Sequence, residues 1–329
     1  MRVGCVFDFR NPAPWRRPYA DVYRDTLDTM VRAEALGFDT AWTTEHHFLD
    51  DGYLPSQLPV LAAVAARTRQ IGIGTFVLLL PLHDPVRVAE DAAVVDIISG
   101  GRLTLGLGQG YRVSEFRGFC KDSTRRGPAL TEGVEVLRKA WSGKPFSHEG
   151  RFWRYSNISV TPPPAQPGGP AIMIGARSEA GIRRVARMGC HFLPIGEKRD
   201  VELYRAACAE CGRPPGQVRI LRSCYVAEDY ERERGQLWPH MKYLLDSYTQ
   251  WMFEADDTPG DKRKLADGFR DVGNFFAGTA GEVVDQIGRF RDDVRPDEIV
   301  LIFHFPGLDW KVSRRSMERF AARVLPHIR

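Results

Sequence analysis

The sequence has few cysteines and no long apolar run. A disulfide framework, as in small secreted proteins, is not expected, because the six cysteines show no regular spacing and reduced thiols suit such a pattern. No run approaches the roughly 20 apolar residues that a membrane helix needs, and Asp8 interrupts the N-terminal apolar stretch too early for a signal peptide. The C-x-x-C pair Cys208 and Cys211 has no second pair, so a structural zinc site is not indicated. We expect a cytoplasmic protein that does not bind membranes.

Neither basic nor acidic residues predominate in the sequence. The 329 residues carry 46 Lys and Arg against 42 Asp and Glu, a net charge of +4 spread along the chain. This excess is too small and too scattered for nucleic acid binding. The 43% hydrophobic and 27% charged residues are ordinary for a globular protein.

Short β-type runs alternate with helical patterns along the whole chain. The expected strands lie near residues 3–7, 40–43, 71–80, 103–108, 171–175, 191–195, 218–226 and 299–304. Eight β–α alternations over this length predict a (β/α)8 TIM barrel, α/β in class, as a single domain over residues 1–329. Insertions are expected near residues 144–170, with a hairpin, and near residues 229–278, where aromatic residues follow a helical pattern. Long insertions of this kind lie over a barrel mouth or form subunit contacts.

Glu45, His46 and His47 directly follow the second expected strand, where β/α barrels place their chemistry. A metal site, an acid/base site and a polar cap are the alternatives. Neighbouring His46 and His47 point in different directions in an extended segment, and the other strand ends are poor in carboxylates. We therefore expect no metal, and an acid/base role or a cap remains for His46.

A possible anion site lies after the fifth expected strand. This strand ends in Gly175, and Ser178 stands at the N-cap of the next helix, where free N–H groups and the helix dipole favour a phosphate. The alternative is that Ser178 only caps its own helix. The glycine-rich Gly106–Gly110 stretch does not open a helix, so it is a weak dinucleotide signal and is read as allowing close approach of a flat ligand.

These motifs together resemble the bacterial luciferase-like flavin-dependent monooxygenases. The resemblance is carried by EHHF, IGIGTFVLLLPLHDPVRVAEDAAVVDIISGGRLTLGLGQGY, TPPPAQPGGPAIMIGARS, FAGTAGEVVDQIGRF, EIVLIFHFPG and SMERFAARVLPHIR. It implies a barrel that binds reduced FMN, which a separate flavin reductase supplies. It also implies O2 as co-substrate, a C4a-(hydro)peroxyflavin that oxygenates an organic substrate, and a homodimer formed through the early helices.

The resemblance also assigns site residues by position. His46 matches the family's catalytic histidine, and imidazole titrates near neutrality, which suits proton transfer. Phe76 and Val77 match a bulged position beneath the flavin ring that is often a non-proline cis peptide. Further cofactor contacts are expected from the fourth and fifth strand ends and from the arginines near residue 125, namely Gly108, Gln109, Tyr111, Arg125, Arg126, Ala176, Arg177 and Ser178.

The chain departs from luciferase at Gly108 and Gln109, where luciferase has a cysteine and an arginine. The missing arginine removes one phosphate partner, for which Arg112 or Arg177 could substitute, and the missing cysteine argues against light emission. Phe9, Trp42 and Phe305 are expected in the substrate pocket, which suits an apolar or aromatic molecule. Two other functions stay open: hydride transfer by an F420-dependent oxidoreductase, and flavin binding without catalysis.

Overall fold

A ring of parallel strands forms the centre of the protein. The computed structural model describes residues 1–194, 198–254 and 275–329. The strands of the ring are β1 (Arg2–Phe7), β2 (Thr40–Thr43), β3 (Gly72–Leu78), β4 (Leu103–Leu107), β7 (Ala171–Gly175), β8 (His191–Leu193), β9 (Arg219–Val226) and β11 (Glu298–Ile302). They pair in the order β9-β11-β1-β2-β3-β4-β7-β8, and a bridge between Phe192 and Val218 joins β8 to the start of β9. The predicted (β/α)8 barrel is confirmed.

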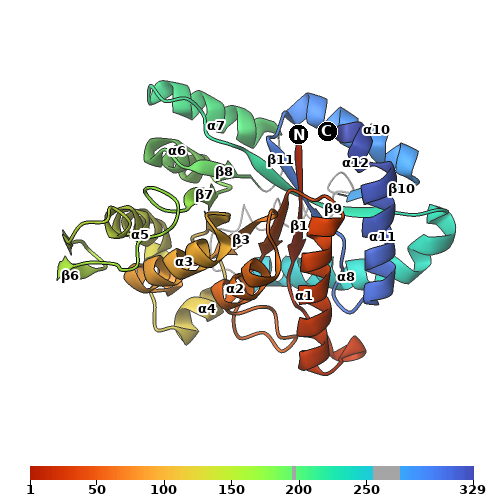
Figure 1. Cartoon of the computed structure of the whole chain (residues 1–329), viewed down its shortest axis with the longest axis horizontal. Coiled ribbons are helices and arrows are strands. Elements are labelled where there is room, and N and C mark those ends of the chain that lie inside the picture. Colours follow the sequence, from red (N-terminus) through yellow and green to blue (C-terminus); the bar gives the residue numbers. More distant parts are fainter. Residues whose placement is uncertain (195–197, 255–274) are drawn as a thin grey trace.

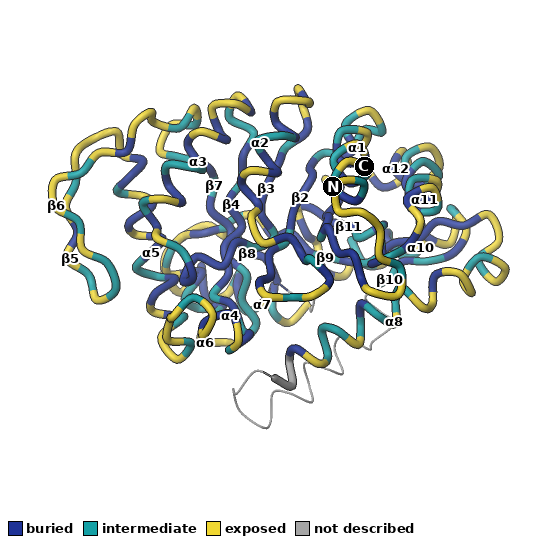
Figure 2. The backbone as a smooth tube through the Cα atoms, turned by 90° about the horizontal axis from the view of Figure 1, so that it is seen from below, coloured by how far each residue is buried: buried dark blue, intermediate teal, exposed yellow. Residues whose placement is uncertain are grey.

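Helices surround this ring and cover its outer face (Figure 1). The main helices are α1 (Tyr19–Ala35), α2 (Gln57–Arg67), α3 (Pro85–Ser99), α5 (Arg126–Ala140), α6 (Glu179–Met188), α7 (Lys198–Glu210), α10 (Ala280–Val294) and α11 (Trp310–Arg323). Shorter elements are α4 (Val113–Gly118), α12 (Leu325–Ile328) and the 3-10 turns η1 (Ala13–Trp15), η2 (Leu80–Leu82) and η3 (Ser123–Arg125). Figure 2 shows that buried residues lie along the strands and the inward sides of the helices. None of the described helices combines the length and the apolar character needed to cross a membrane.

Local sequence signals explain where several helices begin and end. Thr279 and Glu282 form a capping box at the start of α10. The carboxylate of Asp84 accepts hydrogen bonds from the first N–H groups of α3, which ends at Gly100 in the left-handed region. Ser178 caps α6 by accepting a hydrogen bond from the Gly181 N–H.

The two insertions differ in how well the sequence predicts them. The expected hairpin is present as β5 (Phe146–Glu149) and β6 (Arg154–Ile158), paired antiparallel. The second insertion contains α8 (Tyr230–Glu254), which lies along the lower edge of the molecule in Figure 2 and buries Leu237, Leu244 and Trp251. It also contains a strand that the sequence analysis did not predict, β10 (Phe275–Gly278), which pairs in parallel with the end of β9. Residues 255–274 of this insertion, and residue 195 of the expected sixth strand, lie outside the described residues.

Candidate active site

His46 lies just beyond the carboxyl end of β2 and is almost fully buried. Its Nδ1 is 2.7 Å from Oε1 of Glu115 on α4, and its Nε2 is 3.2 Å from the hydroxyl of Tyr111. The same Glu115 oxygen accepts the backbone N–H of His47 at 2.9 Å, and it lies 3.3 Å from Nη1 of Arg112. The carboxylate therefore fixes the orientation of the imidazole.

The electrostatics of Glu115 determine which nitrogen of His46 is available. Burial alone would raise the pKa of Glu115, but the hydrogen bond and charge of His46, the His47 N–H and Arg112 lower it on balance. Glu115 is therefore a carboxylate at neutral pH and accepts a proton-bearing Nδ1. This leaves Nε2 of His46 as the nitrogen that can exchange a proton.

Aromatic rings from distant parts of the chain enclose His46. Ring centroids lie 4.8 Å away for Tyr53, 5.0 Å for Trp251, 5.5 Å for Tyr111 and 6.2 Å for Tyr248. Tyr248 and Trp251 belong to α8, so the second insertion reaches the candidate site, as expected for an insertion over the barrel mouth. The hydroxyls of Tyr53 and Tyr248 are 2.8 Å apart.

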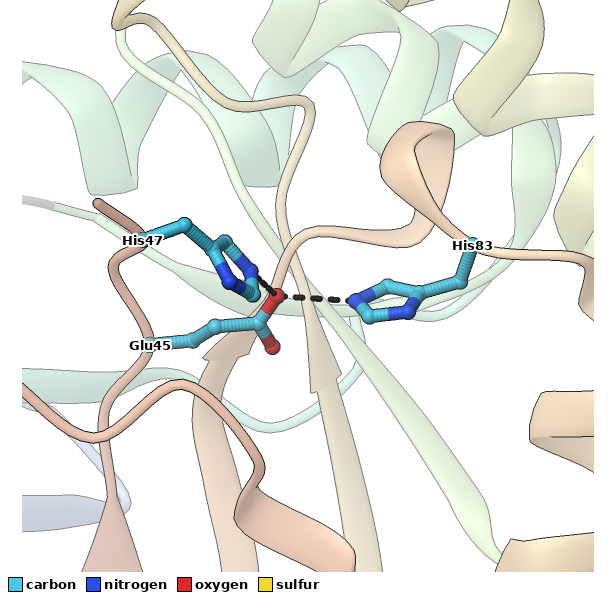
Figure 3. A group of neighbouring side chains, drawn as sticks. All are labelled: Glu45, His47 and His83. Carbon is cyan, nitrogen blue, oxygen red and sulfur yellow. Dashed lines mark hydrogen bonds and ion pairs between the residues drawn. The ribbon is translucent and has the colours of Figure 1, made fainter. Parts of the chain in front are cut away.

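A second polar group lies beside this site (Figure 3). Oε1 of Glu45 is 2.8 Å from Nε2 of His47 and 2.8 Å from Nε2 of His83. Among the described residues this is the one group whose ligand atoms are close enough to hold a metal ion. The other Glu45 oxygen accepts the Gln57 amide at 2.9 Å, so hydrogen bonds account for this geometry without an ion.

Charge explains why buried Glu45 is tolerated. Burial would raise its pKa, but the hydrogen bonds and charges of His47 and His83 lower it to about 2. In return, the pKa of His83 is raised by the hydrogen bond to Glu45, although burial opposes the change. Glu45 thus links the segment after β2 to the segment after β3, which agrees with a role in orienting the loop that carries His46.

A small cavity of about 20 Å³ lies between the end of β7 and the start of α6. Four of the predicted cofactor contacts line it: Gln109, Ala176, Arg177 and Ser178. Arg184, which the sequence analysis missed, lines it too. Burial lowers the pKa of Arg177 to about 10 and also lowers that of Arg184. Desolvated guanidinium groups beside a helix N-terminus fit a phosphate, because an anion offsets the cost of burying positive charge.

Two predicted basic contacts lie elsewhere. Arg125 is exposed, with its Nε 3.3 Å from the Asp122 carboxylate, and Arg126 donates to the carbonyl of Ser123. Neither residue lines the cavity beside Ser178. In this position Arg184 is the better candidate, since it lies about one helical turn after Gly181, which also lines the cavity and whose N–H is capped by Ser178.

The peptide bond between Phe76 and Val77 is cis, as the resemblance implied. The pairing of β3 with β4 shifts between Thr75 and Leu78, which marks the bulge. A Cβ on Gly108 would lie 2.4 Å from Cγ2 of Val77. Glycine at position 108 therefore lets the end of β4 pack closely against the bulge of β3. This packing requirement could not be predicted from the sequence alone.

The three predicted pocket residues do not gather around His46. Phe9 packs on Tyr23 of α1, with ring centroids 4.9 Å apart. Trp42 lies inside the barrel, where its Nε1 donates to Thr40 Oγ1 at 2.7 Å. Phe305 packs against Phe275 of β10, at 6.0 Å.

Tyr53 and Glu115, which contact His46, and Arg10, which contacts the rings of Tyr53 and Trp251, were not predicted from the sequence. Glu115 had a detectable signal, because it is a carboxylate in the loop after the fourth strand, where barrels place functional groups. Arg10 follows the first strand in the same way. Nothing local distinguishes Tyr53, since its place depends on how the long segment after β2 folds back.

Comparisons with known proteins show which family the chain resembles. The model of the luciferase-like monooxygenase family matches residues 1–294. The oxygenase component of the flavin-dependent trigonelline monooxygenase of Acinetobacter baylyi is 25% identical over 328 residues, covering 93% of this chain and 89% of the relative. The F420-dependent glucose-6-phosphate dehydrogenase of Nakamurella multipartita is 27% identical, covering 93% and 92%.

A solved structure is also similar over the full length. The crystal structure of the monooxygenase RslO1 from Streptomyces bottropensis superposes with a TM-score of 0.86 at 27% identity, and the match covers 100% of both chains. The barrel therefore follows an arrangement already seen in an experimental structure.

Proposed function

Because the chain belongs to the luciferase-like monooxygenase family, we propose that it is the oxygenase component of a two-component FMN-dependent monooxygenase. Its substrate would be an apolar or aromatic organic molecule. One atom of O2 enters the substrate and the other leaves as water, while reduced FMN, delivered by a separate reductase, supplies two electrons and two protons. The observation that carries this proposal is that the buried His46–Glu115 pair lies at the same end of the barrel as the cavity between β7 and α6.

The cavity between β7 and α6 supports the cofactor assignment. Ser178, the α6 N–H groups, Arg177 and Arg184 would hold the FMN phosphate. Phe76 and Val77, with Gly108 behind them, would support the flavin ring. Bound reduced FMN supplies the chemistry that activates O2.

The protein's own task is to move a proton and to exclude water. With Nδ1 held by Glu115, Nε2 of His46 can accept a proton from the reacting molecule or return one. The Tyr111 hydroxyl, 3.2 Å from Nε2, can hydrogen-bond to this nitrogen and orient the imidazole. The rings of Tyr53, Tyr248 and Trp251 keep the site apolar, which protects reactive species from hydrolysis.

The test mixes purified protein with reduced FMN under anaerobic conditions and then admits air containing ¹⁸O2. We expect protein to slow the return of oxidised FMN, and candidate substrates to gain one ¹⁸O atom. His46→Ala should bind FMN as the wild type does and form no labelled product. Free reoxidation of FMN, combined with tight binding of F420 and hydride transfer from its reduced form, would establish the F420-dependent alternative instead. FMN binding with neither reaction would establish a protein that binds flavin without catalysis.

We also propose that two copies form a homodimer. Helix α3 exposes three large apolar side chains, Val94, Ile97 and Ile98, each 42–45% exposed. Sedimentation of the wild type should give the mass of two chains, and Ile98→Glu should shift the protein to one chain. A monomeric wild type at micromolar concentration would refute association.

A further inference from the structure

Arg10 is a buried cation, and one of its guanidinium nitrogens, Nη1, has no acceptor among the described residues. It follows β1, and its side chain is 0% exposed. Its Nε donates to Oδ2 of Asp51 at 2.6 Å, and its Nη2 donates to Ser247 Oγ on α8 at 2.8 Å. Within the part of the chain that the structure describes, the buried Nη1 has no acceptor. A buried N–H that gives up water without a replacement is costly, so this geometry favours a ligand that brings an oxygen.

Two aromatic rings, those of Tyr53 and Trp251, lie beside both Arg10 and His46. The Arg10 guanidinium carbon lies 5.4 Å from the centre of the Tyr53 ring and 4.9 Å from that of Trp251. The same two rings lie 4.8 Å and 5.0 Å from the His46 ring. A molecule that contacts both rings would therefore lie near both the Arg10 guanidinium and the imidazole of His46. Aromatic rings such as these favour contact with a flat, conjugated ligand.

The charges near Arg10 favour an uncharged ligand. Asp51 already neutralises the guanidinium. Asp8 accepts the Arg10 backbone N–H at 3.2 Å, and burial raises its pKa to about 6, so near neutral pH it adds negative charge. The next cation, Arg112, is bonded to Glu115 and to the His47 carbonyl. A carboxylate ligand would bring a further negative charge into a buried region where three carboxylates, those of Asp8, Asp51 and Glu115, already face two guanidinium groups.

We propose that Nη1 of Arg10 binds the carbonyl oxygen of the substrate, and that the substrate is a flat, uncharged ring compound lying against Tyr53 and Trp251. Arg10 is then a specificity-determining residue of the monooxygenase site. This inference rests on the proposed function, since it names the substrate class of the same site. The competing interpretation is that Arg10 serves only to hold α8, through Asp51 and Ser247, over the barrel.

The test compares matched pairs of probes that differ in one oxygen. Acetophenone is paired with ethylbenzene, and acetylnaphthalene with ethylnaphthalene; naphthoate tests for anion recognition. Each is titrated into the full-length protein, with and without oxidised FMN, and binding is followed by tryptophan fluorescence. We expect at least one ketone to bind about tenfold or more tightly than its hydrocarbon partner, as for a hydrogen bond to a charged donor.

Paired substitutions locate the effect. Arg10→Met combined with Asp51→Asn removes the donor and its counter-charge together, so no buried charge is left unpaired. The ketone preference should disappear in this variant. Arg219→Met combined with Glu298→Gln removes another buried pair, joined at 3.0 Å near the start of β9 and β11, and should keep the preference. Arg10→Lys retains the charge without Nη1 and should lose the preference even if the double variant does not fold.

Several outcomes would overturn the inference: equal binding of ketone and hydrocarbon, tighter binding of naphthoate, a preference that survives Arg10→Lys, or no ketone binding at millimolar concentration. None of these results depends on oxygen chemistry. The slowed reoxidation of FMN is measured without a probe, so failure of the proposed function and failure of this inference can be told apart.

Discussion

Nδ1 of His46 lies 2.7 Å from Oε1 of Glu115, although the two residues are 69 positions apart in the sequence. One residue follows β2, and the other lies on the short helix α4 after β4. Their contact turns a histidine at a strand end into an imidazole with a fixed tautomer. The proposed chemistry depends on this pair.

Replacing Glu115 with Gln keeps the shape and the acceptor oxygen but removes the negative charge beside Nδ1 of His46. We expect kcat to fall by about a hundredfold, the low end of what a positioned acid or base contributes. KM and FMN affinity should stay at their wild-type values, because the amide fills the same space. Stopped-flow turnover and flavin titration measure the two effects. An unchanged kcat would mean that the carboxylate is only structural.

Arg184 and its neighbour Arg183 offer a matched comparison on α6. Arg184 lines the cavity beside Ser178, whereas Arg183 is paired with Glu179 and Glu210 on the surface. Arg184→Gln should raise the Kd for FMN about tenfold or more, as expected for the loss of a charged hydrogen bond. Arg183→Gln should leave the Kd unchanged. Equal effects of the two substitutions on flavin fluorescence titrations would place the phosphate elsewhere.

Glu45 should make the stability of the protein sensitive to acid. Its pKa is lowered from 4.5 to about 2, so its contribution is complete above about pH 4.5 and is lost as pH falls toward 2. Each unit corresponds to about 1.4 kcal/mol, so the wild type should lose at most about 3 kcal/mol more than Glu45→Gln over this range. Urea unfolding at a series of pH values measures the difference. Parallel curves for the two proteins would show that the histidines do not stabilise the charge.

Gly108→Ala should strain the contact between β4 and the bulge of β3. The new methyl group would lie 2.4 Å from Cγ2 of Val77, so a shift costing about 1–3 kcal/mol of unfolding free energy is expected. Combining it with Val77→Ala should recover part of this loss, since the two side chains compete for one space. A double-mutant cycle from urea unfolding gives the coupling. Additive effects would mean that the contact is relieved by backbone movement.

The order of the barrel elements could be read from the sequence. Strand and helix periodicities are local, and capping residues such as Asp84, Ser178 and Thr279 mark helix starts through their own backbone hydrogen bonds. His46 and the Gly175–Ser178 segment could be singled out for the same reason, because a strand end determines the side of the barrel on which its loop lies. The four-residue strand β10 was not predicted, because it is stabilised by pairing with β9, which is distant in the sequence.

What surrounds His46 was decided only by the tertiary structure. Glu115, Arg10, Tyr53 and Trp251 come from four separate segments, and no local pattern relates them. The same holds for the arginines expected near the cofactor phosphate. Arg184 lines the cavity beside Ser178, whereas Arg125 and Arg126 do not. Sequence periodicity determines which residues face the core within one element. Contacts between elements depend on how loops and α8 pack over the barrel, and that packing is a property of the whole fold.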